Sequence, residues 1–438
     1  MPNLDTYHKR IADKLLSEQL ETAGAVLIQG PKWCGKTTTA EQLAKSVIYI
    51  DNPKQLKTNV TLAETDPETL LRGDNPRLID EWQLTPQLWD AARYLISHQR
   101  KTGLYIFTGS AVPPDKTLIT HSGTGRFAWL TMRTMSLWES GDSSGAFSLE
   151  ALFKQQAKVA GAKDLSINDL AYLVCRGGCP GVLGMSEKNA LKQSRNYVDA
   201  VCNSDISRVD NVERNAAFAA RLLRVFARHQ GGQVSVSMIN ADLTANQPSM
   251  SDDTVASYLS ALKNIFVIED MPAWCPNLRS KTAIRTADTR YFIDSSIATA
   301  ALGVGPDDLL NDLNTFGLMF ETLAVRDLRV YADYLDGKVF HYRDKNGLEC
   351  DAVIHLRNGS YGLIEIKLGG DTLIEEGAKT LLKLAGKIDT DKMKQPSFLM
   401  VLTGLGSYAY KRKDEVWVVS IGSLKNYPHI FVPLLNYY

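Results

Sequence analysis

The segment Gly30–Thr37, which reads GPKWCGKT, has a pattern of residues that can hold phosphate groups. It fits G-x-x-x-x-G-K-[ST] at every position, follows the apolar stretch AVLIQ (25–29) and precedes a helical pattern. Glycines let the backbone wrap an anion, Lys36 reaches the β- and γ-phosphates, and the Thr37 hydroxyl binds Mg²⁺. The sequence therefore predicts a site for ATP and Mg²⁺ made of Gly30, Pro31, Lys32, Trp33, Cys34, Gly35, Lys36, Thr37 and Thr38.

Acidic and polar residues at the ends of later apolar stretches complete this candidate site. Asp80, in RLIDE, ends a predicted buried strand and is placed to bind Mg²⁺, while the adjacent Glu81 is a candidate base for the attacking water. Ser110 follows the next strand, where a polar residue can sense the γ-phosphate. Arg126 and Arg133 flank the last strand, and either is a candidate arginine finger for a neighbouring subunit. The alternative for each arginine is an ordinary solvated side chain.

A second group of residues with chemical potential lies near the C-terminus. Asp351 begins one predicted strand, and Glu365 and Lys367 share a face of the next, because side chains alternate with a period of two. Two carboxylates and a lysine can hold Mg²⁺ or Mn²⁺ and activate a water for attack on a phosphodiester. Glu321, on the preceding predicted helix, is a candidate third acid of this metal site. The competing interpretation is a salt-bridged pair of strands, with Glu321 an ordinary surface acid.

Elements that position the first group alternate between strands and helices. Apolar stretches at 25–29, 47–51, 77–81, 104–110 and 126–132 are separated by helical patterns, which predicts an α/β fold with a doubly wound, mainly parallel sheet typical of P-loop NTPases. The Gly- and Ser-rich stretch Ser140–Ser148 marks the exit from this domain. We predict four segments: an ATPase domain at 1–140, a helical connection at 141–214, a winged helix-turn-helix at 215–300 and an α/β domain at 301–438.

The winged-helix prediction comes from three helical patterns and two apolar stretches. Helices are expected at 216–229, 235–243 and 252–266, the last capped by Ser251 or Asp252, and FVIED is expected to pair as a strand with RYFID (290–294). Lys263 is the only base on the candidate recognition helix. The wing carries the basic residues Arg279, Lys281, Arg285 and Arg290, which suit weak, sequence-independent contacts with DNA or RNA phosphates. The alternative is a solvated hairpin, or one that contacts the ATPase domain.

The elements around the C-terminal group predict a small domain. A long helix at 314–333 precedes strands at 339–343, 351–356, 361–367, 397–403 and 416–420. This order, with Asp351, Glu365 and Lys367, resembles the PD-(D/E)xK (restriction-endonuclease-like) nuclease fold, and Glu321 matches that fold's helical acid. Cys350 stands where the pattern has proline. The resemblance implies a metal-dependent nuclease, although a shared fold does not require activity.

The order of motifs in the first segment resembles the AAA-type ATPases. Three further phrases, MRTMSLWESGD (132–142), GGCPG (177–181) and PAWCPNLRSK with YFIDSSIATAALG (272–303), resemble a narrower group. That group consists of bacterial and archaeal ATP-binding proteins in which such an ATPase precedes a C-terminal domain of unknown function. The likeness covers nearly the whole chain, and it implies architecture more than purpose.

Composition limits the classes of partner. The 438 residues contain 49 basic and 49 acidic side chains, so any affinity for nucleic acid must come from a local patch. Six cysteines without a CxxC pair fit reduced thiols, and no apolar run reaches the length of a membrane span, so we expect a cytoplasmic protein with no membrane partner.

Two functions remain open at this point. In the first, an ATPase acts on nucleic acid that the C-terminal site cuts. In the second, the protein is a nucleotide-gated switch or scaffold, forming a nucleotide-dependent homo-oligomer, and its nuclease-like domain only binds. A motor that remodels proteins is disfavoured, because no aromatic pore-loop residues follow the second strand.

Overall fold

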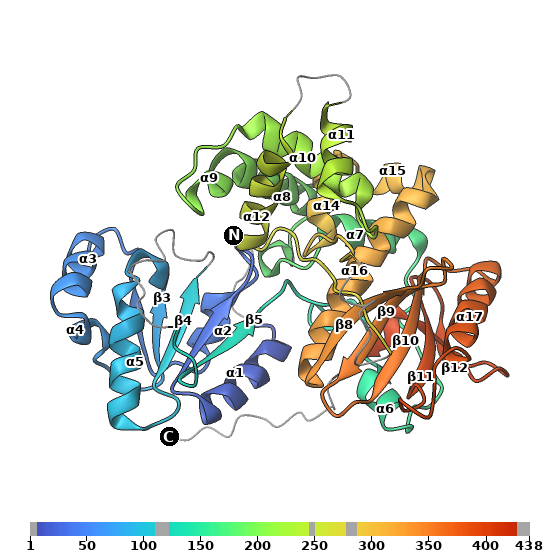
Figure 1. Cartoon of the computed structure of the whole chain (residues 1–438), viewed down its shortest axis with the longest axis horizontal. Coiled ribbons are helices and arrows are strands. Elements are labelled where there is room, and N and C mark those ends of the chain that lie inside the picture. The colour runs from blue at the N-terminus through green and yellow to red at the C-terminus, as the bar shows by residue number, and fades with distance from the viewer. Residues whose placement is uncertain (1–6, 110–121, 245–249, 277–286, 427–438) are drawn as a thin grey trace. The chain divides into compact units, whose positions relative to one another are not determined.

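The computed structural model describes residues 7–109, 122–244, 250–276 and 287–426 (Figure 1). The chain divides into two compact units, each built from separate stretches of sequence. The first unit comprises Met1–Ser136, Ala171–Met271 and Ala287–Arg326, and the second comprises Leu137–Leu170, Pro272–Thr286 and Asp327–Tyr438. One boundary falls inside a single helix, between Arg326 and Asp327. The division of the sequence into four segments stays a prediction.

A five-stranded sheet with the strand order β2-β3-β4-β1-β5 forms the centre of the N-terminal part of the first unit. Every pair of neighbouring strands is parallel, which confirms the predicted α/β fold of this part. The strands are β1 (Ala25–Gln29), β2 (Ser46–Tyr49), β3 (Arg77–Asp80), β4 (Tyr105–Gly109) and β5 (Phe127–Thr131). The helices are α1 (Ile11–Thr22), α2 (Lys36–Glu41), α3 (Leu56–Thr65), α4 (Pro67–Leu71) and α5 (Gln87–Gln99).

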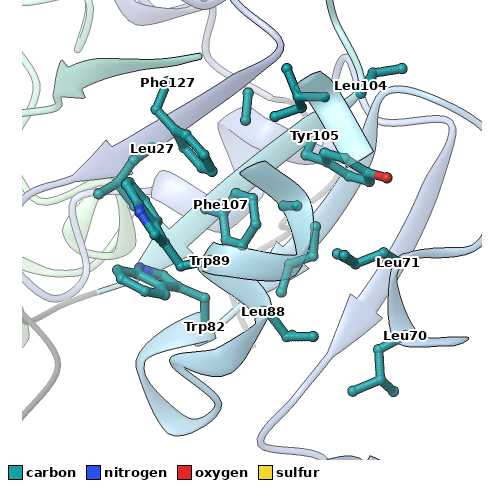
Figure 2. Close-up of a cluster of buried hydrophobic side chains, with 14 of the residues drawn as sticks. Leu27, Leu70, Leu71, Trp82, Leu88, Trp89, Leu104, Tyr105, Phe107 and Phe127 are labelled. Atoms are coloured by element: carbon teal, nitrogen blue, oxygen red, sulfur yellow. The ribbon is translucent and has the colours of Figure 1, made fainter. Parts of the chain in front are cut away.

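Alternate residues of the strands enter two separate cores. Leu27 and Phe107 pack with Trp82, Trp89 and Phe127 in the mixed aliphatic and aromatic cluster shown in Figure 2, where the rings of Trp89 and Phe127 stack at 3.8 Å. The intervening residues, among them Val26, Ile28 and Ile106, pack against α1 and α2. Because both faces are covered, the strands read as continuous apolar runs. The sheet is thereby a rigid support for the loops at its carboxyl end.

The rest of the first unit is helical. It contains α8 (Glu187–Ala200), a π-helical turn (Val201–Asp205), α9 (Ile206–Arg208), α10 (Ala216–His229), α11 (Val236–Thr244), α12 (Asp252–Asn264), α14 (Ser295–Leu302), α15 (Pro306–Asn311) and most of α16 (Leu313–Tyr334), and α7 (Ile167–Arg176) begins in the second unit. Ser251 caps α12 by accepting from the Thr254 amide at 3.1 Å. The expected pairing of FVIED with RYFID is present, as antiparallel bridges between Ile268 and Phe292 and between Met271 and Thr289. The Glu269 amide donates to the Tyr291 carbonyl at 2.9 Å, but the bridges are isolated and do not form continuous strands.

A seven-stranded mixed sheet with the order β7-β12-β13-β11-β10-β9-β8 forms the second unit. Its strands are β7 (Ala160–Gly161), β8 (Gly337–Arg343), β9 (Glu349–Leu356), β10 (Tyr361–Lys367), β11 (Phe398–Thr403), β12 (Tyr408–Lys411) and β13 (Trp417–Ser420). Strands β8, β9 and β10 are antiparallel neighbours, whereas β10, β11 and β13 run parallel. Helix α17 (Asp371–Ala385) crosses from β10 to β11 and buries Ala378, Leu381 and Leu384 in the core. The same unit holds α6 (Leu149–Phe153) and a small pair of strands, β6 (Phe147–Ser148) and β14 (Leu424–Lys425).

Candidate functional site

Gly30–Gly35 forms the loop between β1 and α2, and Lys36 and Thr37 begin α2, as the motif requires. We call Gly30–Thr37 the phosphate loop. Gly30 has φ +154°, and a Cβ atom there would lie 2.0 Å from the Met132 carbonyl oxygen. Gly35 has φ +98°, a backbone conformation that other residues rarely adopt. Both glycines are therefore required by the shape of the loop.

Lys36 is buried inside this loop. Its Nζ donates to the carbonyl oxygens of Gly30 at 3.0 Å and Pro31 at 2.7 Å, and 7% of the residue is exposed. These acceptors are neutral, so a phosphate oxygen would be a stronger partner for the ammonium group. The loop thus holds Lys36 where a bound phosphate would be expected to engage it.

Asp80 ends β3 and lies beside the first hydroxyl of α2. Its Oδ1 accepts from Thr37 Oγ1 at 2.9 Å and from Thr108 Oγ1 at 2.5 Å. Burial raises the pKa of Asp80, and the hydrogen bonds from Thr108 and Thr37 oppose that shift. A hydroxyl and a carboxylate side by side are oxygen ligands of the kind Mg²⁺ prefers, so Thr37 and Asp80 fit the predicted ion.

Glu81 lies immediately after Asp80, in a left-handed backbone conformation with φ +55°. Its Oε2 accepts a hydrogen bond from Gln83 Nε2. Burial raises the pKa of Glu81, the bond from Gln83 lowers it, and the neighbouring Asp80 raises it. Because Glu81 and Lys36 line the same cavity, the carboxylate lies at the edge of the candidate phosphate site.

The cavity over the loop has a volume of about 950 Å³, within the range of small-molecule sites. Besides the loop, residues far along the chain line it, including Tyr7, Arg10, Pro180, Asp205 and Arg208. Several of these hold the loop directly. Arg10 donates to the carbonyl oxygens of Cys34 at 2.8 Å and Arg133 at 2.9 Å, and Lys32 Nζ lies 2.6 Å from Asp205 Oδ1. The exposed ring of Trp33 lies 6.0 Å from that of Tyr197.

Sequence reasoning missed these contributions, because nothing in a local motif indicates which distant helix covers it. The one usable signal was the turn-rich GGCPG segment, which contains Pro180. Arg208 forms no ion pair or hydrogen bond within the described ranges, so its charge is available to a ligand in the cavity.

The other predicted members of this site have different outcomes. Ser110 lies outside the described residues. Arg126 is exposed and donates from Nε to Ser97 Oγ at 3.2 Å, and its role as a finger stays a prediction. Arg133 pairs with Glu269 at 2.6 Å, with 9% of its side chain exposed, so that pair must break before Arg133 can reach another subunit.

Asp351, Glu365 and Lys367 come together in the second unit. Lys367 Nζ lies 3.1 Å from Asp351 Oδ2 and 2.7 Å from Glu365 Oε2, and the Ile366 amide donates to Asp351 Oδ2 at 2.7 Å. The pairing of β9 with β10 places Ala352 opposite Ile364, so Asp351 and Glu365 follow on neighbouring strands. We refer to these three residues as the carboxylate–lysine cluster.

Burial and charge shape the cluster. Burial and the neighbouring Asp351 raise the pKa of Glu365, since two carboxylates close together disfavour double ionisation. Burial alone would lower the pKa of Lys367, but Asp351 and Glu365 raise it above its usual value. With both acids ionised the cluster has a net charge of −1. Its carboxylate oxygens suit Mg²⁺ or Mn²⁺, provided that Lys367 gives way.

Glu321 lies on the part of α16 that belongs to the first unit. There its Oε1 accepts a hydrogen bond from the Tyr291 hydroxyl. Within residues 7–109, 122–244, 250–276 and 287–426, no group of three or more His, Cys, Asp or Glu side chains is arranged to hold a metal ion. The proposed metal-binding role of Glu321 stays a prediction.

The structure describes only two of the five basic residues expected to contact nucleic acid, Lys263 and Arg290. Arg279, Lys281 and Arg285 lie outside the described residues. Lys263 and Arg290 both pair with Asp270 Oδ2, at 2.5 and 2.9 Å, and Arg290 also donates to the Val234 carbonyl. One acid thus offsets the charge of the base on α12 and of one base of the expected wing.

Three of the phrases singled out in the sequence meet at Asp294. Its Oδ2 accepts from Thr134 Oγ1 at 2.5 Å and from the Gly178 amide at 3.0 Å, and lies 3.2 Å from Arg326 Nη1. Burial would raise the pKa of Asp294, but Arg326 and the hydrogen bonds lower it to about 2. Asp294 is fully buried. The phrases therefore encode a structural network in the first unit.

Three family models match separate segments of the chain. Residues 22–140 match the family model described as an AAA domain. Residues 167–308 and 316–424 match two domains of unknown function, DUF8612 and DUF4143. Uncharacterized proteins of Mycobacterium tuberculosis (Rv2008c) and Mycobacterium bovis (Mb2031c) are each 23% identical over 376 residues, covering 85% of this chain and 77% of theirs.

Two solved structures show only a distant likeness. The Walker-type ATPase PABY2304 of Pyrococcus abyssi is 14% identical with a TM-score of 0.40, covering 68% of this chain and 97% of that one. A STAND protein with a tetratricopeptide repeat sensor, PH0952 of Pyrococcus horikoshii, is 14% identical with a TM-score of 0.21, covering 76% and 54%. These scores are too low to carry an argument about the whole chain.

The phosphate loop and the match to an AAA domain agree. Residues 22–140 form an AAA-type P-loop domain, the kind of domain that binds and hydrolyses ATP. A separate finding concerns membranes: among the described helices, none combines the length and the apolar character needed to cross a bilayer.

Proposed function

We propose that the chain is an ATP-driven enzyme that acts on nucleic acid, with the carboxylate–lysine cluster as a metal-dependent phosphodiesterase site. The observation that carries this proposal is the convergence of Asp351, Glu365 and Lys367, with Lys367 Nζ within 3.1 Å of both carboxylates. A chance acid–lysine pattern in the sequence would not have to bring all three side chains to one point.

The order of elements around the cluster adds support. Helix α16 precedes the antiparallel strands β8, β9 and β10, and α17 then leads to β11, which lies parallel to β10. This order is consistent with the resemblance to the restriction-endonuclease-like fold, whose core Asp351, Glu365 and Lys367 match. Asp351 lies on β9 and Glu365 on β10.

The three side chains have distinct roles in this proposal. Asp351 and Glu365 hold a divalent cation, which supplies Lewis-acid activation of a water or phosphate oxygen when bound. Lys367 then turns from the carboxylates, where its ammonium group can orient the attacking water or stabilise charge that develops on the phosphate. Glu321 is retained as a candidate helical acid.

The ATPase part of the proposal depends on residues of the phosphate loop and of the end of β3. Lys36 contacts the β- and γ-phosphates, Thr37 and Asp80 hold Mg²⁺, and Glu81 is the base for the attacking water. Ser110 as a γ-phosphate sensor and Arg126 as a finger in a homo-oligomer complete the assignment.

The middle region is proposed as a winged helix-turn-helix that contacts DNA or RNA weakly and without sequence preference. The succession of α10, α11 and α12, followed by antiparallel bridges at Ile268–Phe292 and Met271–Thr289, is consistent with it. Because Asp270 already binds Lys263, α12 is a poor candidate for reading bases.

A specific observation favours the second candidate function, a nucleotide-gated switch or scaffold. Lys367 is paired with both acids of the cluster, as in an ordinary buried ion network. In that case the C-terminal unit only binds a partner, and ATP changes the oligomeric state.

Cleavage of labelled single- and double-stranded DNA and RNA tests the first candidate. The reactions contain Mg²⁺ or Mn²⁺, with and without ATP, and compare wild type with Asp351→Ala and Lys36→Ala. We expect cleavage by wild type and none by Asp351→Ala, and the Lys36→Ala reaction shows whether ATP gates it. Asp344→Ala removes a partly buried acid that is paired with Lys387 outside the cluster, and it is the matched control. Absence of cleavage on every substrate would establish the switch as the better account.

A further inference from the structure

Helix α10 presents a face made only of alanine and arginine. Its exposed positions are Ala217, Ala220, Arg221, Arg224 and Arg228, and the helix contains no acidic residue. The opposite side is apolar and buried, through Phe218, Ala219, Leu222, Leu223, Val225, Phe226 and Ala227. Because that buried side anchors the helix, the exposed residues, which we call the α10 face, are held on a fixed support.

The three arginines of this face are not neutralised by neighbouring acids. None of them forms an ion pair or hydrogen bond within the part of the chain that the structure describes; Arg221 lies 5.8 Å from the ring centre of Phe218. Arg214, just before the helix, behaves differently and pairs with Asp210 at 2.6 Å. The α10 face thus concentrates three positive charges in a chain whose formal net charge is zero.

Ordinary helix stability explains only part of this pattern. Cations in the last turn of a helix interact favourably with its dipole, which accounts for Arg228 and for His229, which also pairs with Asp242. Arg221 and Arg224 lie further back, where the effect has faded. Their position on one face calls for a different explanation.

The spacing of the arginines fits a polyanion. Three and four residues separate them, so the stripe extends about 10 Å at a rise of 1.5 Å per residue. Duplex DNA carries about six backbone charges over that length, at one per 1.7 Å. Ala217 and Ala220 have small side chains beside the stripe, which lets a backbone approach closely.

We propose that the α10 face binds the phosphate backbone of nucleic acid without reading its sequence. This inference rests on the proposed action on nucleic acid, and it places the contact on α10 rather than on α12, where Asp270 holds the only base. Arginine suits this role because its planar guanidinium matches the oxygens of a phosphate.

The test measures binding of the full chain to fluorescein-labelled duplex and single-stranded DNA in EDTA, so that cleavage cannot contribute. In the triple variant Arg221→Ala/Arg224→Ala/Arg228→Ala we expect at least about a tenfold loss of affinity at low salt. The slope of log K against log salt should become shallower by about 2.7, or 0.9 for each lost contact with duplex. The corresponding triple substitution to lysine should retain most of the binding, which separates charge from folding.

The matched control is Lys14→Ala/Lys154→Ala/Lys392→Ala. It removes the same net charge from exposed lysines, each paired with a nearby acid in its own segment. The proposal is overturned if the control loses as much affinity, if the arginine variant binds normally, or if wild type binds no nucleic acid. Binding of labelled polyglutamate is measured in the same way, as a probe for an acidic protein partner. If the arginine variant loses affinity for polyglutamate but not for DNA, the α10 face binds an acidic protein and the proposal is overturned. A chain that binds but never cuts would instead contradict only the nuclease proposal.

Discussion

The phosphate loop and the carboxylate–lysine cluster each hold a lysine, buried in the loop and partly buried in the cluster, but in opposite electrostatic settings. Lys36 donates to two neutral carbonyl oxygens of its own loop, whereas Lys367 is paired with two carboxylates. The first site therefore has an excess of positive charge and is ready for an anion. The second has a net negative charge when both acids are ionised and is suited to a cation.

The two sites also differ in how the chain builds them. The loop comes from eight consecutive residues whose geometry is imposed by Gly30 and Gly35. The cluster forms only when β9 and β10 pair in the correct register, which places Asp351 beside Glu365. Loss of folding should thus affect the two sites separately, because they lie in different units.

Asp294→Asn provides the strongest way to separate the two units. The variant removes the charge of Asp294, which lies 3.2 Å from the buried Arg326 guanidinium, and breaking a buried ion pair costs about 3–5 kcal/mol. We expect hydrogen exchange to accelerate mainly in residues of the first unit, with β9 and β10 still protected. Equal loss of protection in both units would show that they unfold together.

Lys36→Ala should break the anion site alone. A hydrogen bond to a charged group contributes about 1.5–3 kcal/mol, so loss of the lysine contacts should weaken ATP binding about a hundredfold or more. Titration calorimetry with ATP and Mg²⁺ measures the change. Lys32→Ala is the control from the same loop, since Lys32 is tied to Asp205 and should matter less. If the two variants bind ATP equally well, the role given to Lys36 is wrong.

Some features are formed by residues close together in the sequence and others by residues far apart. This difference also explains which features could be predicted from the sequence. Strand β10 matches its predicted bounds of 361–367, and β1 those of 25–29, because each is a buried apolar run next to a recognisable motif. The meeting of Asp351, Glu365 and Lys367 followed from a period of two and an antiparallel pair. Those features depend on neighbouring residues, which a sequence displays directly.

Features that depend on contacts between residues far apart in the chain could not be predicted from the sequence. Thr134, Gly178 and Arg326 meet at Asp294 although the chain separates them widely, and only the fold brings them together. The two-residue strand β7 pairs with β12, far along the chain, and is too short to leave a pattern. The pairing near Ile268 and Phe292 is limited to isolated bridges, an extent that the apolar pattern does not indicate.

Glu81→Gln should separate binding from hydrolysis at the anion site. The amide cannot accept the proton of the attacking water, and loss of general-base catalysis typically slows a reaction about 10²–10⁴-fold. We expect a matching fall in kcat with ATP affinity retained, measured by phosphate release. Gln83→Ala removes the partner of Glu81 Oε2 while keeping the carboxylate, so it should hydrolyse ATP faster than Glu81→Gln. Wild-type turnover by Glu81→Gln would assign the base elsewhere.

Divalent cations should stabilise the second unit through the carboxylate–lysine cluster. We expect this to be the smallest of the four predicted effects. If Asp351 and Glu365 hold Mn²⁺, binding stabilises the folded second unit by RT ln(1 + [L]/Kd), about 2.7 kcal/mol at a hundredfold excess over Kd. Hydrogen exchange of β9 and β10 in the presence of Mn²⁺ should slow for wild type and stay unchanged for Asp351→Asn. Asp344→Asn is the control, because its partner Lys387 lies outside the cluster. The Lys36→Ala variant should respond to Mn²⁺ in β9 and β10 as wild type does, because Lys36 is not part of the cation site proposed in the second unit. Protection that depends on Lys36 rather than on Asp351 would mean that the cation binds at the phosphate loop, and the contrast between the two sites would then be lost.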